Sequence, residues 1–156
     1  MKTLFESILD DEDVLVKDTK EHYNNPFLVI QALLNEYSLN EVKHKMDYID
    51  KILKPIKDQF MKYTKIKKNG LGFDINNSYT GNNSYSLKFY TFHDGERMVL
   101  FTFNYIPQSK DEIYCFKNSI ADELGYSMTL NGVSKFLISK YNFKQKYFKD
   151  TLVLEL

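Results

Sequence analysis

The side chains that could perform chemistry in this chain are few and lie far apart in the sequence. His22, His44 and His93 are the only histidines, and no two of them have the spacing of a metal-binding pair. Cys115 is the only cysteine, so it can form neither an internal disulfide nor a zinc site with other thiolates. We expect Cys115 to be a small buried hydrophobic residue, and we predict no metal and no cofactor.

His93 and Asp94 are the one adjacent pair that resembles part of an acid–base or metal site. However, Asp94-Gly95 is also a strong signal for a two-residue β-hairpin turn, because both positions tolerate positive φ. The serines and carboxylates show neither a nucleophile-elbow motif nor a paired-acid pattern. The sequence therefore predicts no catalytic residues and a protein that is not an enzyme.

Length and composition indicate one folded domain over residues 1–156, because 43% of the residues are hydrophobic and 15% are aromatic. No apolar run approaches the ~20 residues that a membrane helix needs. Acidic residues appear as early as Glu6, which is not typical of a signal peptide. Together with the single cysteine, these features favour a reducing compartment and no membrane contact.

Charge is distributed in blocks, although the net charge is zero. Residues 1–50 carry 11 acids and 5 lysines, whereas residues 51–68 carry 7 lysines and one aspartate. Residues 126–149 contain five lysines and no acid. Such blocks indicate either a solvated face, internal pairing or a polar partner surface.

The N-terminal third is predicted to be helical. Asn25-Pro26 combines a capping residue with a proline in the first turn, and the apolar residues that follow predict a buried helix. Ser38 and Glu41 form a capping box that opens one long helix, over about 39–66, with Pro55 as a kink. Its stripe allows packing within the chain or a homodimer through the 39–63 helix: Leu39, Val42, Met46, Ile49, Leu53, Ile56, Phe60 and Tyr63.

The middle of the chain changes to a period of two and predicts a three-stranded antiparallel meander over about 71–106. Its strands are expected at 71–79, 84–92 and 97–106, with Phe92 paired to Arg97 across the Asp94-Gly95 turn. In this register one face carries Tyr90, Phe92, Val99, Phe101, Phe103 and Tyr105, and the other carries Leu87, Phe89, Met98 and Leu100. Helices could cover both faces, or the aromatic face could bind a partner or stack on bases.

Two C-terminal helices and a final strand complete the predicted fold. Ser109 and Glu112 form a capping box for a helix ending near Gly125, and a second helix is expected from Ser127 to Tyr141. Alternating leucines near residue 156 predict a strand added to the sheet. Helices gathered against an antiparallel sheet give the α+β class.

Residues 119–127 resemble the first helix and turn of helix-turn-helix DNA-binding proteins. Ala121 stands where that family has an alanine inside the first helix, and Gly125 where it has the turn glycine. The resemblance implies that the following helix enters the major groove, so that residues 119–141 form a degenerate helix-turn-helix. Asn131 departs from the family's hydrophobic anchor. Lysines suited to phosphate contact follow the turn: Lys135, Lys140 and Lys144.

The first 15 residues resemble the leader of many small proteins of gut Bacteroidetes and of their tailed phages, including crAss-like phages. They are also similar in design to the capsid-targeting leaders of phage internal proteins. The resemblance implies a phage accessory or virion-associated interaction protein, located in the host cytoplasm or the virion. Residues 1–13 would be a docking leader, with protein contacts made by one short apolar stripe: Leu4, Phe5, Ile8 and Leu9.

Overall fold

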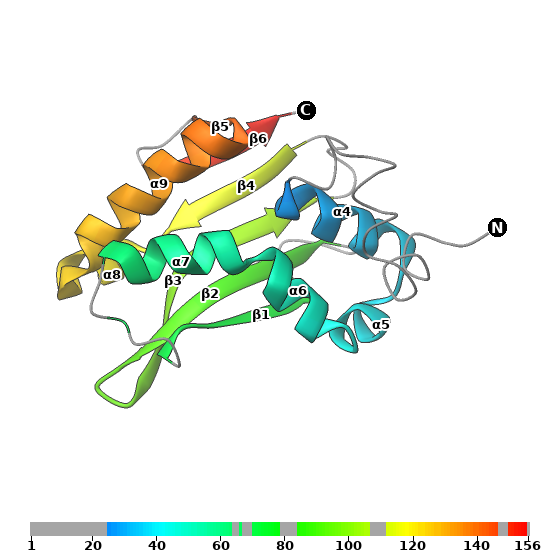
Figure 1. Cartoon of the computed structure of the whole chain (residues 1–156), viewed down its shortest axis with the longest axis horizontal. Helices are drawn as coiled ribbons and strands as arrows, with labels where there is room; N and C mark the ends of the chain where they lie inside the picture. The colour runs from blue at the N-terminus through cyan, green and yellow to red at the C-terminus, as the bar shows by residue number, and fades with distance from the viewer. Residues whose placement is uncertain are drawn as a thin grey trace. The chain divides into compact units, whose positions relative to one another are not determined.

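The computed structural model describes residues 25–63, 66, 70–78, 84–106, 112–146 and 150–155. The chain forms two compact units, Met1–Leu53 and Lys54–Leu156. Regular structure in the described part of the first unit is helical, and the second unit combines helices with an antiparallel sheet (Figure 1). The predicted α+β class is therefore confirmed.

Helix α4 (Pro26–Glu36) begins where the sequence predicts. The Asn25 side chain accepts a hydrogen bond from the Phe27 N–H at 3.0 Å, and Pro26 lies in the first turn, where a missing N–H leaves no bond unmade. Apolar residues around most of the helix are buried, as expected from its sequence: Phe27, Leu28, Val29, Ile30, Leu33 and Leu34.

The single long helix predicted over 39–66 is wrong. The Ser38–Glu41 capping box is present, but three helices follow it. Proline has no N–H for a bond to the preceding turn, so a helix is interrupted before Pro55 and a new one begins with Pro55 in its first turn. The earlier break, at His44-Lys45, coincides with no proline or glycine. The helices are α5 (Leu39–Lys43), α6 (Met46–Ile52) and α7 (Lys54–Tyr63).

This interruption also breaks the continuous rod that allowed a homodimer as the alternative to packing within the chain, and the homodimer stays an untested prediction. Five residues of the predicted stripe are nonetheless fully buried: Val42, Ile49, Leu53, Ile56 and Phe60. The spacing of apolar residues therefore predicted which side chains are buried, but it did not predict one uninterrupted helix.

The sheet in the described ranges has six strands, two more than predicted, and all are antiparallel, in the order β1-β2-β3-β4-β6-β5. The first three strands and the last were predicted. The Asp94-Gly95 turn has φ values of 51° and 78° and pairs Phe92 with Arg97, as expected. The strands are β1 (Gly72–Asn77), β2 (Tyr85–His93), β3 (Glu96–Tyr105), β4 (Glu112–Lys117), β5 (Phe143–Gln145) and β6 (Thr151–Glu155).

Strand β4 replaces the first half of the helix predicted from Ser109 to Leu124. Burial along it alternates, with Ile113 and Cys115 buried and Phe116 exposed. Aromatic and β-branched residues favour strands, and β4 gains backbone partners on both sides from β3 and β6. Helical structure begins only afterwards, in α8 (Ser119–Ala121) and the kinked segment η3 (Asp122–Tyr126).

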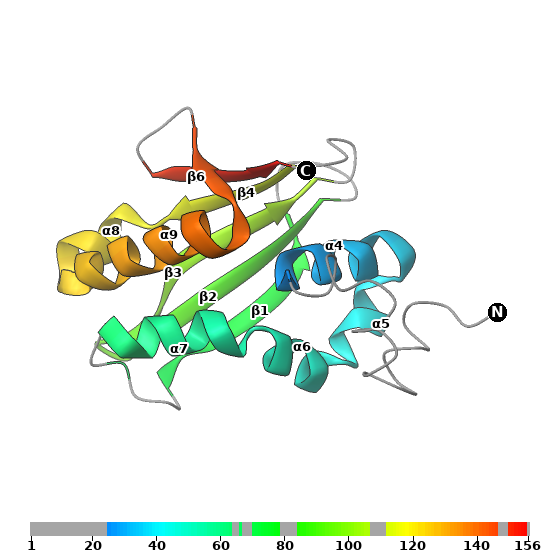
Figure 2. The same ribbon diagram turned by 45° about the horizontal axis from the view of Figure 1, so that its top comes forward.

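Helix α9 (Ser127–Tyr141) lies beside α7 on the same face of the sheet (Figures 1 and 2). On the α7 side, the Phe60 ring lies 5.7 Å from that of Phe89 and 5.3 Å from that of Phe101, centre to centre. Helix α9 buries the stripe that its sequence predicts: Leu130, Val133, Leu137 and Tyr141. The two helices thus form one layer, and their outer surfaces define the candidate site.

Candidate functional site

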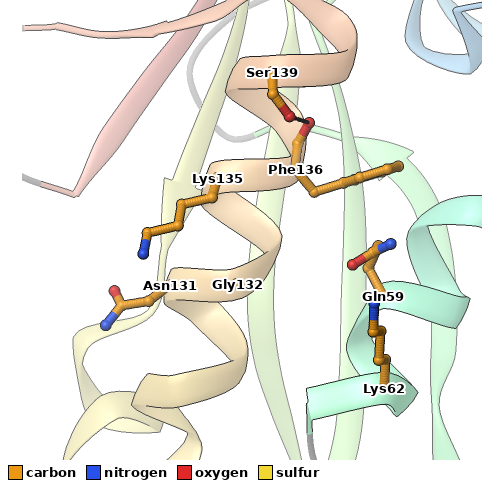
Figure 3. Close-up of a pocket in the computed structure, with 7 residues that line it drawn as sticks. All are labelled: Gln59, Lys62, Asn131, Gly132, Lys135, Phe136 and Ser139. Carbon is orange, nitrogen blue, oxygen red and sulfur yellow. Dashed lines mark hydrogen bonds between the residues drawn. The ribbon is translucent and has the colours of Figure 1, made fainter.

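The outer surface of α7 and α9 is hollowed into a groove of about 590 Å³. None of the described residues that line it is acidic, and two of them are lysines. The groove therefore combines positive charge, amide and hydroxyl groups, and one aromatic ring. Its lining residues are Gln59 and Lys62 from α7, and Asn131, Gly132, Lys135, Phe136 and Ser139 from α9 (Figure 3).

The aromatic ring lies between two sets of polar side chains. Figure 3 shows Phe136 reaching from α9 toward α7, where Gln59 and Lys62 lie. Lys135 and Asn131 extend from the other side of α9. A ligand lying along α9 would therefore meet an apolar surface at its centre and a lysine on each side.

Packing within α9 fixes the ring. Phe136 contacts Tyr141 edge-on, with ring centres 5.5 Å apart, and Tyr141 is itself buried. The Ser139 hydroxyl donates a hydrogen bond to the Phe136 carbonyl at 3.3 Å, which keeps that hydroxyl against its own helix. The ring is half-buried, so part of it is accessible to a ligand.

Helical periodicity explains why these residues share one surface. Residues four apart lie on the same side of a helix, which places Asn131, Lys135 and Ser139 in one row on α9. The buried stripe of α9 faces the sheet and leaves that row outside. A helical-wheel reading of residues 127–141 could have found this row, but the pairing of α9 with α7 depends on contacts between residues far apart in sequence.

The side chains that line the groove are of kinds that bind ligands. Lysine ammonium groups attract anions, and carboxamides can both donate and accept hydrogen bonds. A half-buried ring offers apolar contact area to a side chain or a base. These properties suit a ligand that is anionic and partly apolar.

Comparison of this chain with protein-family models, curated proteins and solved structures found no match. None of the helices in the described ranges is long and apolar enough to cross a membrane. What the groove binds must therefore follow from its own charge and shape.

The predicted aromatic face is divided between the two faces of the sheet. Phe89 pairs with Phe101 and Tyr90 with Val99, so Leu100 is an extra residue that forms a β-bulge. The bulge shifts the alternation by one residue, and this is why the predicted register fails beyond it. Three of the predicted face residues are therefore buried on the side that α7 and α9 cover: Phe101, Phe103 and Tyr105.

Tyr90 and Phe92 remain on the opposite face, where they contact each other and a charged pair. The Arg97 guanidinium lies 3.6 Å from the centre of the Tyr90 ring and forms an ion pair with Asp74. The Tyr90 ring also covers Gly72 of the neighbouring strand. This face is thus a local packing arrangement around one tyrosine rather than a continuous stacking platform.

The region that resembles a helix-turn-helix keeps its turn but not its first helix. Gly125 has φ of +96°, a left-handed conformation that glycine adopts without strain, and α9 follows it. Because β4 extends to Lys117, only a short helical segment precedes the turn. Lys135 and Lys140 are exposed on α9, whereas Lys144 lies on strand β5.

The remaining predicted residues fall into two groups. Leu4, Phe5, Ile8 and Leu9 lie outside the described residues. The His93–Asp94 pair lies at the tip of the hairpin, where Nε2 of His93 is 3.5 Å from Oδ2 of the exposed Asp94.

Cys115 is fully buried, and burial raises the pKa of its thiol well above the ordinary value. Burial likewise raises the pKa of Tyr105, whose hydroxyl has no hydrogen-bond partner among the described residues. Within the described ranges, no three His, Cys, Asp or Glu residues are placed to hold a metal ion.

Proposed function

We propose that this chain is a non-enzymatic interaction protein that binds an anionic partner protein in the groove between α7 and α9. The observation that carries the proposal is that the groove joins two lysines, Lys62 and Lys135, with an aromatic ring, and that its described lining includes no acidic residue. A partner with carboxylates would gain charge-assisted hydrogen bonds from both lysines.

The sequence supports this beyond the lining residues. Helix α7 comes from the block 51–68, which carries 7 lysines and one aspartate. Helix α9 comes from the block 126–149, whose charged residues are all lysines. The packing places α7, which carries three lysines and one aspartate, beside α9, which carries two lysines and no acid. A surface of one sign accelerates encounter with a partner of the opposite sign and makes that encounter sensitive to salt.

The proposal is tested with charged polymers. We expect fluorescein-labelled poly-L-glutamate to bind the chain in an anisotropy titration at low salt, and poly-L-lysine not to bind. The double variant Lys62→Glu/Lys135→Glu should abolish the binding, whereas Lys144→Glu, a charge reversal on β5, should reduce it only slightly. Equal binding by the wild type and the double variant would contradict the assignment of the groove.

A phage setting is the biological context that we propose for this interaction protein, in the host cytoplasm or the virion. It is supported by the resemblance of residues 1–15 to phage and Bacteroidetes leaders, with Leu4, Phe5, Ile8 and Leu9 as docking residues. Deleting residues 1–13 should then remove the chain from purified phage particles in a co-sedimentation assay. Unchanged association with particles would eliminate the docking role.

Duplex DNA binding through residues 119–141 is the second candidate function. It is favoured by the Gly125 turn before α9 and by two exposed lysines, Lys135 and Lys140. It predicts binding that weakens steeply with salt, because phosphate contacts release counterions, and that Lys135→Glu/Lys140→Glu abolishes. Lys62→Glu should leave DNA binding intact, which separates this candidate from the groove. No duplex binding by the wild type at low salt would exclude it.

A further inference from the structure

The distribution of groups in the α7–α9 groove specifies more than an anionic ligand. Apolar contact is offered at the centre, by Phe136, and positive charge is offered at the two sides, by Lys62 and Lys135 (Figure 3). A uniformly charged ligand would use the lysines and leave the ring unused. A ligand with one apolar stripe between acidic flanks would use all three.

The setting of the groove favours a helical ligand. It runs between two neighbouring helices that already rest on a sheet, and the ridges of a third helix can pack into such a surface. Gly132 has no side chain, so the α9 backbone is open to close approach one turn before Phe136. The carboxamides of Gln59 and Asn131 can donate hydrogen bonds to side chains at the edges of such a ligand, or accept hydrogen bonds from them.

Resting on the function proposed above, we propose that the occupant is an acidic amphipathic helix of a partner protein. Its apolar stripe lies on Phe136, and acidic residues on its two flanks pair with Lys62 and Lys135. This is the helix-in-groove mode, in which anchors one turn apart give affinity and flanking charges give orientation. A single-stranded nucleic acid, which could stack a base on Phe136, is the competing occupant.

Designed peptides distinguish these ligands. The test peptide has about 18 residues, long enough to form a helix, with leucine and phenylalanine on one stripe and glutamates on both flanks. One control has the same composition in a scrambled order that destroys the stripe, and another replaces every glutamate with glutamine. A labelled single-stranded oligonucleotide is titrated in parallel, with fluorescence anisotropy as the readout.

We expect the amphipathic acidic peptide to bind at least about tenfold more tightly than either control, because a central aromatic anchor carries much of such an interface. Its helicity, followed by circular dichroism, should rise on binding. Phe136→Ala should remove the preference for the ordered peptide over the scrambled one. Because Phe136 contacts Tyr141, a second variant, Ser139→Phe, fills the groove from an exposed position and should block binding in a fully folded chain.

The outcomes separate this inference from the function on which it rests. If poly-L-glutamate binds through the two lysines but the scrambled peptide equals the ordered one, the groove binds anions and the helical ligand is wrong. If the oligonucleotide binds more tightly than every peptide and Phe136→Ala weakens it, the occupant is a nucleic acid and the inference is overturned. If neither polymer nor peptide binds, the proposed function itself fails.

Discussion

On the face of the sheet that α7 and α9 cover, Phe89, Phe101 and Phe103 are fully buried, whereas on the opposite face Phe92 keeps 61% of its surface exposed. The covered face takes its aromatic side chains from β2 and β3, whereas Tyr90 and Phe92 of the opposite face both come from β2. The covered face packs its rings against α7 and against one another, with ring centres 5.3 to 6.3 Å apart. The opposite face surrounds Tyr90 with Arg97, Asp74 and Gly72.

The difference shows that residue type does not decide which face is the core. One extra residue, Leu100, shifts the alternation of β3 so that Met98, Leu100 and Phe101 are all buried. Energetically, the covered face should depend on packed volume, and the opposite face on a few specific contacts. Four measurements test this distinction, in order of decreasing expected effect.

The largest effect is expected from truncating a ring on the covered face. Phe101→Ala should lower the free energy of unfolding by about 3–5 kcal/mol, because a large cavity is left between the sheet and Phe60. Phe92→Ala, the matched truncation on the opposite face, should cost less than about 1 kcal/mol. Urea denaturation of both variants gives the comparison. Similar losses in the two would mean that the opposite face is also covered in solution.

The bulge also marks the limit of what the sequence predicted. The Asn25 cap, the Ser38–Glu41 capping box, the Asp94-Gly95 turn and the buried stripe of α9 follow from local chemistry, and these predictions were confirmed. The bulge at Leu100 has no such local signal, because an extra residue is set by pairing with β2 and β4. Strand β4 was mistaken for a helix because the apolar residues at 113, 116 and 120 have helical spacing, whereas the residues buried in the strand are Ile113 and Cys115, two positions apart.

The groove could be predicted only in part. The row formed by Asn131, Lys135 and Ser139 is implicit in helical periodicity, and Lys135 was singled out from the sequence. Gln59 and Lys62 could not be added to it, because their proximity to α9 depends on how two distant segments pack on one sheet. The leader residues 1–13 rest on resemblance alone and stay a prediction.

The second effect concerns Tyr90 on the opposite face. A Cβ added at Gly72 would lie 2.7 Å from Cε2 of the Tyr90 ring, which the Arg97 guanidinium also contacts. Gly72→Ala should therefore destabilise the chain by about 1–3 kcal/mol, as overpacking does. In a Tyr90→Ala background the same change should cost almost nothing. A double-mutant cycle by urea denaturation measures this coupling, and a coupling of zero would show that the ring moves aside freely.

A smaller effect, of opposite sign, is expected at the end of β3. The Tyr105 hydroxyl is buried without a hydrogen-bond partner among the described residues. Tyr105→Phe should therefore raise the free energy of unfolding by about 1 kcal/mol, because the desolvation cost of an unpaired polar group is removed. Thermal unfolding monitored by circular dichroism is sufficient to detect it. A loss of stability instead would indicate that the hydroxyl has a partner in solution.

The last effect is absent at neutral pH and grows as the solution becomes alkaline. Burial raises the pKa of the Cys115 thiol, so the folded chain keeps it protonated at a pH where the unfolded chain releases the proton. The folded state then binds more protons than the unfolded state, and stability falls as pH rises above the ordinary thiol value of about 8.5. Under reducing conditions, the free energy of unfolding of the Cys115→Ala variant should fall less between pH 7 and 9.5 than that of the wild type. Parallel decreases in the two chains would show that the covered face does not hold this thiol neutral.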